Sequence, residues 1–272
     1  MEITFGYSRK CLYFAKVLEA WSAVASSVHV AVQASAMVLR ACNASNTLCL
    51  QMTLDRKNNQ DLCWAVHKSC ALTVDSASLA SQFQAVLKQK DLVAISSDGA
   101  NLCLRSGKVV CEVTKVMHNT TVYHLKESKF ASACHNKTAR LRLSCVDWNK
   151  LLISQVIMSS PWTHALCLKA NQSEWLWTLR NQAGAECEWC VSLAGGSGAA
   201  SLAGGSHTVS SPCTEVKARY VVNVLMPMLG VWQDDISLLL GEVGLLMEWQ
   251  AHGIVQTAFS PNCDNDVLLD FI

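Results

Sequence analysis

The sequence predicts an α+β protein built from two similar domains, with four helices and a larger number of strands. First, the second half repeats the plan of the first at a lag of roughly 135–140 residues, and a repeat of this size indicates two related domains. Second, 272 residues suit two domains of ordinary size. Third, 51% of the residues are hydrophobic and 16% are charged, a composition that favours a sizeable core over disorder.

The repeat is carried by segments whose apolar patterns align between the halves. The aligned pairs are Phe14–Leu18 with Trp148–Leu152, Phe83–Lys88 with Tyr220–Leu225, and Val93–Leu104 with Asp235–Met247.

The first half predicts two helices, each preceded by a strand and followed by a meander. Met1–Tyr7 is expected to be a strand, and Ser8–Ala25 a helix with Leu12, Val17, Leu18 and Trp21 on one face. Leu62–Val74 is extended, and Asp75 or Ser76 can cap a helix that runs to about Lys88. Hairpin turns are expected at Gly99 and Gly107. Alternating runs predict the other strands, at Val28–Gln33, Ala36–Cys42, Leu48–Leu54, Leu92–Ser96, Asn101–Arg105 and Lys108–Lys115.

The second half follows a polar segment, 126–140, in which apolar residues show neither the helical nor the strand period. This segment is expected to connect domains 1–125 and 141–272. Helices are predicted at Val146–Met158 and Thr214–Met228. The Gly/Ser/Ala-rich run Ala194–Ser206 predicts a flexible loop. Strands are predicted at Arg142–Cys145, His164–Ala170, Glu174–Leu179, Glu186–Leu193 and His207–Cys213, with three more runs and the extended stretch Val267–Ile272 at the end.

Charge and cysteine content exclude several classes of protein. A net charge of +1 gives no whole-molecule attraction to nucleic acid or to an acidic membrane. The N-terminal stretch is interrupted by Lys16 and Glu19, so it lacks a signal-peptide core. The longest apolar run, Val221–Trp232, is too short to span a bilayer. The fourteen cysteines are therefore expected to be reduced thiols in an intracellular protein.

The order of elements, strand, helix, meander, strand, helix, meander, occurs twice. In this respect the whole chain resembles the sliding-clamp fold of proliferating cell nuclear antigen and its relatives. The resemblance implies two βα-sheet units in each domain, with helices lining the inner face of a ring and sheets outside.

Two short segments are similar to one branch of that family. Leu39–Ser45 looks like a turn, and Val113–Asn119 like a strand, of the tail-bearing subunit of the heterotrimeric DNA-damage checkpoint clamp called nine-one-one (9-1-1). The loop Ala194–Ser206 is not typical of that subunit, and the chain stops after its last strand where that subunit carries a long tail. Either the tail has been removed from this sequence or its signalling role does not apply to this chain.

The resemblance implies that cations on the inner helices contact DNA phosphates, which requires no sequence preference. Glu19 and Glu215 dilute the pattern, and a single cation is more typical of a solvated helix face, so the signal is the recurrence of cations on all four predicted helices. The implied DNA-facing residues are Arg9, Lys10, Lys16, Lys88, Lys90, Lys150, Lys217 and Arg219.

The resemblance also implies two protein-binding surfaces. One is a hydrophobic pocket for partner proteins, although ordinary core packing explains the same apolar residues. The other is a pair of edge strands that join neighbouring subunits. The pocket residues are Phe130, Leu141, Leu143, Ile254 and Phe259. The edge residues are Cys111, Val113 and Val116 in the first domain, and Glu188, Cys190 and Ser192 in the second.

No residue is assigned to catalysis, to a metal or to a cofactor. Cys187 and Cys190 have CxxC spacing, but no second pair completes a zinc site, and residues three apart in a strand face opposite sides. Asp234 with Asp235, and Asp264 with Asp266, lie in polar, turn-like contexts.

The function expected from the resemblance is that of a non-catalytic clamp subunit in the nucleus. It would join two other clamp subunits, encircle double-stranded DNA, be loaded by an ATP-driven clamp loader, and recruit checkpoint and repair proteins. The alternatives are a homotrimeric replication clamp and, in another class, a thiol- or metal-dependent enzyme that uses Cys187 and Cys190.

Overall fold

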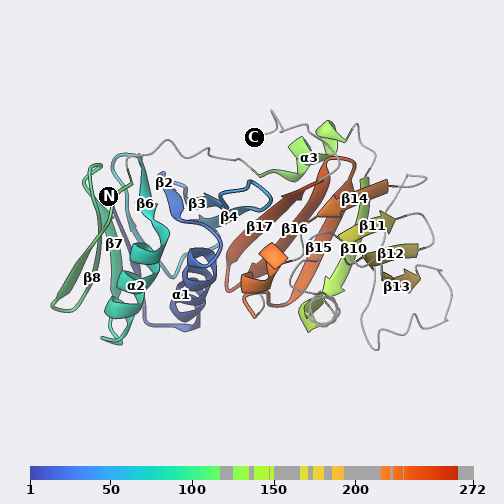
Figure 1. Ribbon diagram of the computed structural model, residues 1–272. Coiled ribbons are helices and arrows are strands. Elements are labelled where there is room, and N and C mark those ends of the chain that lie inside the picture. The colour runs from blue at the N-terminus through green and yellow to red at the C-terminus, as the bar shows by residue number, and fades with distance from the viewer. Residues whose placement is uncertain are drawn as a thin grey trace. The chain divides into compact units, whose positions relative to one another are not determined.

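The computed structural model describes two compact units (Figure 1). Unit 1 comprises Met1–Ala44, Cys49–Tyr123 and Gln250–Gln256, and unit 2 comprises Ser45–Leu48, His124–Trp249 and Thr257–Ile272. For strands β11 to β14 the description covers the backbone alone. The described residues are 1–116, 125–134, 138–146, 148–149, 166–170, 174–180, 186–192, 216–220, 223–228 and 230–262.

Unit 1 contains two successive strand–helix–meander segments. The first is β1 (Glu2–Phe5), α1 (Arg9–Ser22), β2 (Ser27–Val32), β3 (Ala36–Cys42) and β4 (Cys49–Asp55). A short strand, β5 (Cys63–Ala65), follows. The second is β6 (Cys70–Asp75), α2 (Ser76–Leu87), β7 (Val93–Ser97), β8 (Leu102–Ser106) and β9 (Val109–Val113).

The two segments of unit 1 exchange their leading strands. β1 pairs antiparallel with β7 of the second meander, and β6 pairs antiparallel with β2 of the first. The strand order is therefore β5-β1-β7-β8-β9 in one sheet, and β4-β3-β2-β6 is the order of these strands within a second, eight-stranded sheet. Because each segment completes the sheet of the other, neither can form its sheet alone.

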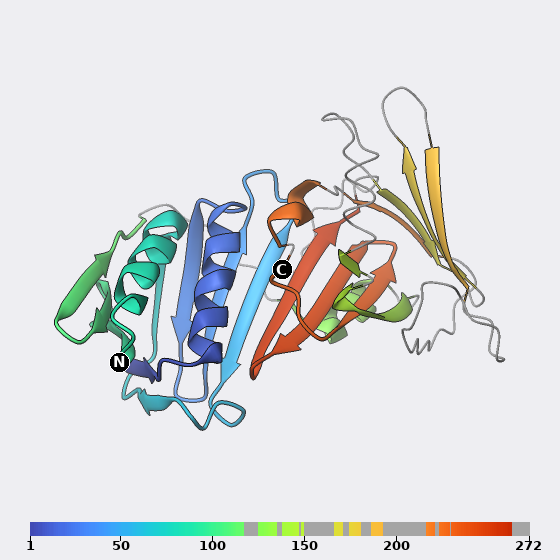
Figure 2. The same cartoon turned by 90° about the horizontal axis from the view of Figure 1, so that it is seen from below.

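Helices α1 and α2 lie side by side across the strands of unit 1 (Figure 2). Ser8 caps α1 by accepting from the Cys11 N–H at 3.4 Å, and Asp75 caps α2 by accepting from the Ser78 N–H at 2.6 Å. Their inner faces meet around Phe5, Phe14 and Phe83, whose ring centroids lie 5.1–6.4 Å apart. All three rings are buried, so they form the core that both segments share.

Unit 2 repeats the same exchange. β10 (Thr138–Ser144) pairs with β15, and β14 (Val216–Tyr220) pairs with β11. A 3₁₀ helix, η1 (Asn223–Met228), contains Pro227. The remaining strands are β11 (Leu166–Ala170), β12 (Glu174–Arg180), β13 (Glu186–Ser192), β15 (Asp235–Gly241), β16 (Gly244–Ala251) and β17 (Ile254–Pro261).

Two aromatic clusters include residues of the strands β16 and β17, which are neighbours in one sheet. Trp232 lies 5.9 Å from both Trp148 and Trp249, measured between ring centroids. Helix α3 (Glu127–Ala133) buries Phe130, whose ring centroid lies 6.0 Å from that of Phe259. Because Gly241 of β15 has no side chain, Cys134 and Phe130 approach its backbone closely. No helix among the described residues is long and apolar enough to cross a membrane.

Most predicted elements of the first half are confirmed within a few residues. The helix predicted at Thr214–Met228 is wrong, because β14 occupies 216–220 and, among the described residues of this range, only η1 is helical. Val216, Ala218 and Tyr220 alternate with Lys217 and Arg219, which is a strand pattern. The prediction assumed a constant spacing between corresponding elements of the two halves. The spacing between the matching strands β6 and β14 is larger than that between the strands of the first meander and their counterparts, so the helix was placed over β14.

The predicted connector, 126–140, contains helix α3 and the first residues of β10. Most of the helix predicted at Val146–Met158, the loop Ala194–Ser206, the strand His207–Cys213 and the stretch Val267–Ile272 lie outside the described residues.

Candidate nucleic-acid and subunit interfaces

The exposed face of α1 carries two of the predicted DNA-facing cations. Arg9, Leu12, Lys16 and Glu19 follow one another at spacings of three or four residues, and all four are exposed. Leu12 was expected on the apolar face, but it is 44% exposed and lies in this row. Two cations and one carboxylate give the face a weak positive charge that suits phosphate groups.

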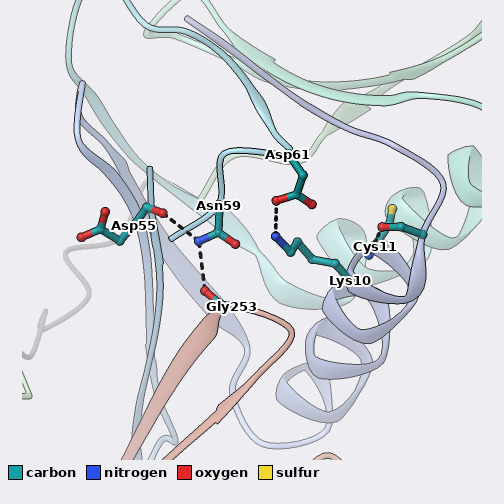
Figure 3. Close-up of polar contacts among 7 residues, drawn as sticks. Lys10, Cys11, Asp55, Asn59, Asp61 and Gly253 are labelled. Atoms are coloured by element: carbon teal, nitrogen blue, oxygen red, sulfur yellow. Dashed lines mark hydrogen bonds and ion pairs between the residues drawn. The ribbon is translucent and has the colours of Figure 1, made fainter. Parts of the chain in front are cut away.

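Lys10 is engaged within unit 1 (Figure 3). Its Nζ lies 2.5 Å from Oδ1 of Asp61, and only 12% of its side chain is exposed. The neighbouring Asn59 is fully buried and donates through Nδ2 to the backbone oxygens of Asp55 at 2.7 Å and Gly253 at 3.0 Å. Lys10 therefore fastens the loop after β4 to the start of α1, so its assignment to a DNA-facing surface is corrected.

Lys88 and Lys90 lie at the C-terminal end of α2 and are exposed. Lys88 is the C-cap residue, and Lys90 adopts a left-handed backbone with φ of 54°. Cations at this end of a helix offset the partial negative charge of the unpaired carbonyls. Both residues are exposed, so an anion can reach them.

The remaining predicted cations do not lie on helices in the described part of the chain. Lys217 and Arg219 belong to β14, opposite Lys169 and Cys167 of β11, so their placement on a fourth inner helix is wrong. Lys150 lies outside the described residues.

Strand β9 is the terminal strand of its sheet, where it pairs with β8. It contains Cys111 and the buried Val113, and it exposes 56% of Val110. A terminal strand with an exposed apolar side chain can accept a further strand.

The segment after β9 is already paired, which corrects the assignment of Val116 to a free edge. The Val116 N–H donates to the Thr73 oxygen at 3.0 Å, and the Asp75 N–H donates to the Thr114 oxygen at 2.8 Å. A bridge between Val74 and Lys115 completes this contact. The open edge therefore ends near Val113.

Strand β13 is the terminal strand of the sheet β13-β12-β11-β14. It contains the predicted edge residues, with Glu188 opposite Thr178, Cys190 opposite Leu176, and Ser192 opposite Glu174 of β12. It also runs continuously through Cys187 and Cys190. Among residues whose side chains the structure describes, no group of three or more His, Cys, Asp or Glu is arranged for a metal ion.

The predicted partner pocket is core. Phe130, Leu141 and Ile254 are 0% exposed, and Leu143 and Phe259 are 1% exposed. The prediction failed because helix α3, which the sequence did not indicate, packs Phe130 onto the sheet of unit 2. These side chains consequently offer almost no surface to a partner.

Comparison with solved structures identifies the fold. Proliferating cell nuclear antigen from Thermococcus kodakaraensis matches with a TM-score of 0.72 at 12% identity, covering 96% of this chain and 99% of that chain. A structure of a PCNA2–PCNA3 complex from Sulfolobus tokodaii matches with a TM-score of 0.69 at 9% identity, covering 97% of this chain and 100% of that chain.

The sequence itself has no comparable match. A scan against protein-family models finds none, and a search of curated proteins finds none. The structural matches nevertheless span nearly the whole chain, so the chain has the α+β fold of the sliding clamps, as the order of its elements predicted.

Proposed function

We propose that this chain is a non-catalytic subunit of a ring-shaped sliding clamp that encircles double-stranded DNA. The observation that carries the proposal is the fold match over 96% of this chain and 99% of a proliferating cell nuclear antigen chain. The same exchange of leading strands in units 1 and 2 supports it, because the exchange accounts for both halves of the chain with one plan. The proposed domains are 1–125 and 141–272.

The proposed subunit contacts use β9 of one chain and the β13 edge of a neighbouring chain. Each is the terminal strand of its sheet, so each has a row of backbone groups available for pairing. One matching structure is a complex of two differently named clamp proteins, which favours a clamp assembled from unlike chains. We accordingly propose a heterotrimer with two other clamp subunits.

The proposed DNA contacts are made by Arg9, Lys16, Lys88 and Lys90, together with Lys150. The first four are exposed on or at the end of α1 and α2. Phosphate contacts of this kind position a duplex without reading its bases. A ring retains DNA through topology, so the modest number of cations is sufficient.

The finer proposal is a subunit of the 9-1-1 checkpoint clamp in the nucleus, opened by an ATP-driven loader and bound by checkpoint and repair proteins. It is supported by the similarity of Leu39–Ser45 and Val113–Asn119 to that branch. A homotrimeric replication clamp is the second candidate, since a matching structure is a proliferating cell nuclear antigen. The candidate of another class is a thiol or metal enzyme that uses Cys187 and Cys190.

The test compares native masses of the purified chain, alone and with candidate clamp subunits, for wild type and two matched variants. Val110→Lys places charge on the β9 edge, whereas Leu92→Lys changes a side chain that is 58% exposed and outside the strands. We expect a three-subunit species that Val110→Lys abolishes and Leu92→Lys preserves. A three-chain homo-oligomer selects the replication clamp.

Two results would overturn the proposal. One is a chain that stays monomeric with every candidate subunit. The other is a stoichiometric metal that Cys190→Ser removes, which selects the enzyme.

A further inference from the structure

Two cysteines face each other at the loop end of the β3–β4 hairpin. Cys42 is the last residue of β3 and Cys49 the first of β4, and the strand register places them directly opposite. Their Sγ atoms lie 2.9 Å apart, and neither cysteine is in a disulfide. Opposed residues of antiparallel strands have Cα atoms about 4.5–5.5 Å apart, within the range that a disulfide spans.

We propose that Cys42 and Cys49 form a redox-sensitive disulfide site that a hydroperoxide closes and a thiol reductant opens. The reaction needs little backbone movement, because the paired strands already hold the sulfurs in contact. The proposal does not depend on the clamp function.

The surroundings assign different roles to the two thiols. Cys42 is half-buried, whereas Cys49 is 2% exposed, so a small oxidant reaches Cys42 first. The hydrogen bond with Cys42 and burial raise the pKa of Cys49 well above its ordinary value. Cys49 therefore keeps its proton, which makes Cys42 the thiol that attacks the peroxide and Cys49 the resolving thiol.

The chemistry balances with one equivalent of hydroperoxide. The Cys42 thiolate attacks the peroxide oxygen, the O–O bond breaks, and the products are a sulfenic acid and hydroxide or alkoxide. The Cys49 sulfur then attacks the Cys42 sulfur, the S–O bond breaks, and the hydroxyl leaves as water with the Cys49 proton. Both sulfurs are oxidised and the peroxide is reduced.

Neighbouring cysteines provide internal controls. Cys103 lies opposite Ser96 on one side and Glu112 on the other, and Cys111 lies opposite Leu104. Neither faces a thiol across its ladder, so neither is expected to close a disulfide within its sheet.

The sequence makes the test direct. Trypsin cuts after Arg40 and Arg56, so Cys42 and Cys49 share a peptide, Ala41–Arg56, that contains no other cysteine. Cys103 and Cys111 fall in separate peptides, Asp91–Arg105 and Val109–Lys115. The folded full chain is treated with hydrogen peroxide, quenched, alkylated with N-ethylmaleimide under denaturing conditions, digested and analysed by mass spectrometry.

We expect peptide Ala41–Arg56 to lose two hydrogens and bind no N-ethylmaleimide after oxidation, and to bind two equivalents after dithiothreitol. Oxidation of Met52 adds oxygen and is separated by mass. The two control peptides keep their alkylation. The attack of Cys49 on the Cys42 sulfenic acid should be faster in the folded chain than in guanidinium, because folding holds the two sulfurs together.

Single variants separate the roles. Cys49→Ser should leave Cys42 as a sulfenic acid that dimedone traps, and Cys42→Ser should leave Cys49 alkylatable. If either variant does not fold, the wild-type peptide still decides. Three results would each overturn the proposal. They are alkylation of both cysteines after peroxide, direct conversion of Cys42 to sulfinic acid in wild type, and a disulfide that forms at the same rate in guanidinium as in the folded chain.

Discussion

Single side chains set where the two helices of unit 1 begin. Ser8 and Asp75 both precede a helix and accept from a backbone N–H in its first turn, at 3.4 Å and 2.6 Å respectively. The shorter contact involves a carboxylate, which binds an amide more strongly than a hydroxyl does and also favours the positive end of the helix. The two caps should therefore differ in their contribution to stability.

Replacing Asp75 with Ala should lower the free energy of unfolding by about 1 kcal/mol, since an unpaired N–H is left at the start of α2. Chemical denaturation of the whole chain measures the change. Asp75→Asn keeps an acceptor and is the matched control. Ser8→Ala should cost less, and a larger loss at Ser8 than at Asp75 would contradict the ranking.

A second side chain, Asp98, makes the β7–β8 turn sensitive to acid. Its carboxylate accepts from the backbone N–H groups of Asn101 at 2.9 Å and Ala100 at 2.8 Å. These hydrogen bonds, that of Asn101 first, hold the pKa of Asp98 below its ordinary value. A depressed pKa in the folded state means that the stabilisation is present above the unfolded pKa and is lost as pH falls through the folded value.

Asp98→Asn should accordingly lower the free energy of unfolding at neutral pH and change it little at acid pH, where Asp98 is already protonated, so the acid limb of the stability–pH curve becomes flatter. Denaturation midpoints between neutral and acid pH measure this, with NMR titration of the Asp98 carboxyl as the direct check. A carboxyl that titrates above about 3.9, the ordinary value for Asp, would show that the turn does not bind the charged form.

At the scale of elements, the packing of α3 on β15 depends on the absence of a side chain at Gly241. A Cβ there would overlap Cys134 Sγ and press on Phe130. We expect Gly241→Ala to destabilise unit 2 by about 1–3 kcal/mol, the usual cost of overpacking. Thermal or chemical unfolding measures the loss.

A second substitution tests the mechanism of that loss. Cys134→Ala removes the sulfur, so it should restore part of the stability when combined with Gly241→Ala. Gly6→Ala is the control, because a Cβ at Gly6 meets nothing within 4 Å. Additive effects of Gly241→Ala and Cys134→Ala would contradict direct contact.

The elements also show what alternation and spacing can predict. Both helices of unit 1 and its meander strands follow from period and capping residues, because those signals are local. Helix α3 was missed because seven residues with a single buried side chain, Phe130, carry almost no period. Strand β14 was missed because the prediction placed corresponding elements of the two halves at a constant spacing, whereas β6 and β14 are farther apart than that.

At the scale of the whole molecule, the candidate DNA surface rests on cations gathered from separate elements. Reversing Arg9, Lys16 and Lys88 to Glu should weaken retention on closed circular DNA and leave assembly and folding intact. The salt dependence should also fall, by a log–log slope of about 0.9 for each phosphate that the variant no longer neutralises. Binding assays over a range of salt concentrations measure both effects.

The matched control reverses Lys57, Lys68 and Lys108, which are equally exposed but lie outside the helices. It changes the net charge by the same amount. If both triple variants lose the same affinity, total charge rather than the helix faces governs binding. Unchanged retention in the helix variant would remove α1 and α2 from the DNA surface.

The sequence by itself determined the order of elements in the first half and its two capped helices, because period and capping depend on residues close together in the chain. It also indicated the duplicated plan, because each half carries the same local patterns. Tertiary structure alone decided which strands pair, since β1 meets β7 and β6 meets β2 through contacts between distant residues. It also decided that Lys10 pairs with Asp61 and that Phe130 is buried. A lysine can bind DNA or a carboxylate, and a phenylalanine can bind a partner or fill a core. The residue type does not distinguish these roles, whereas the packing around the side chain does.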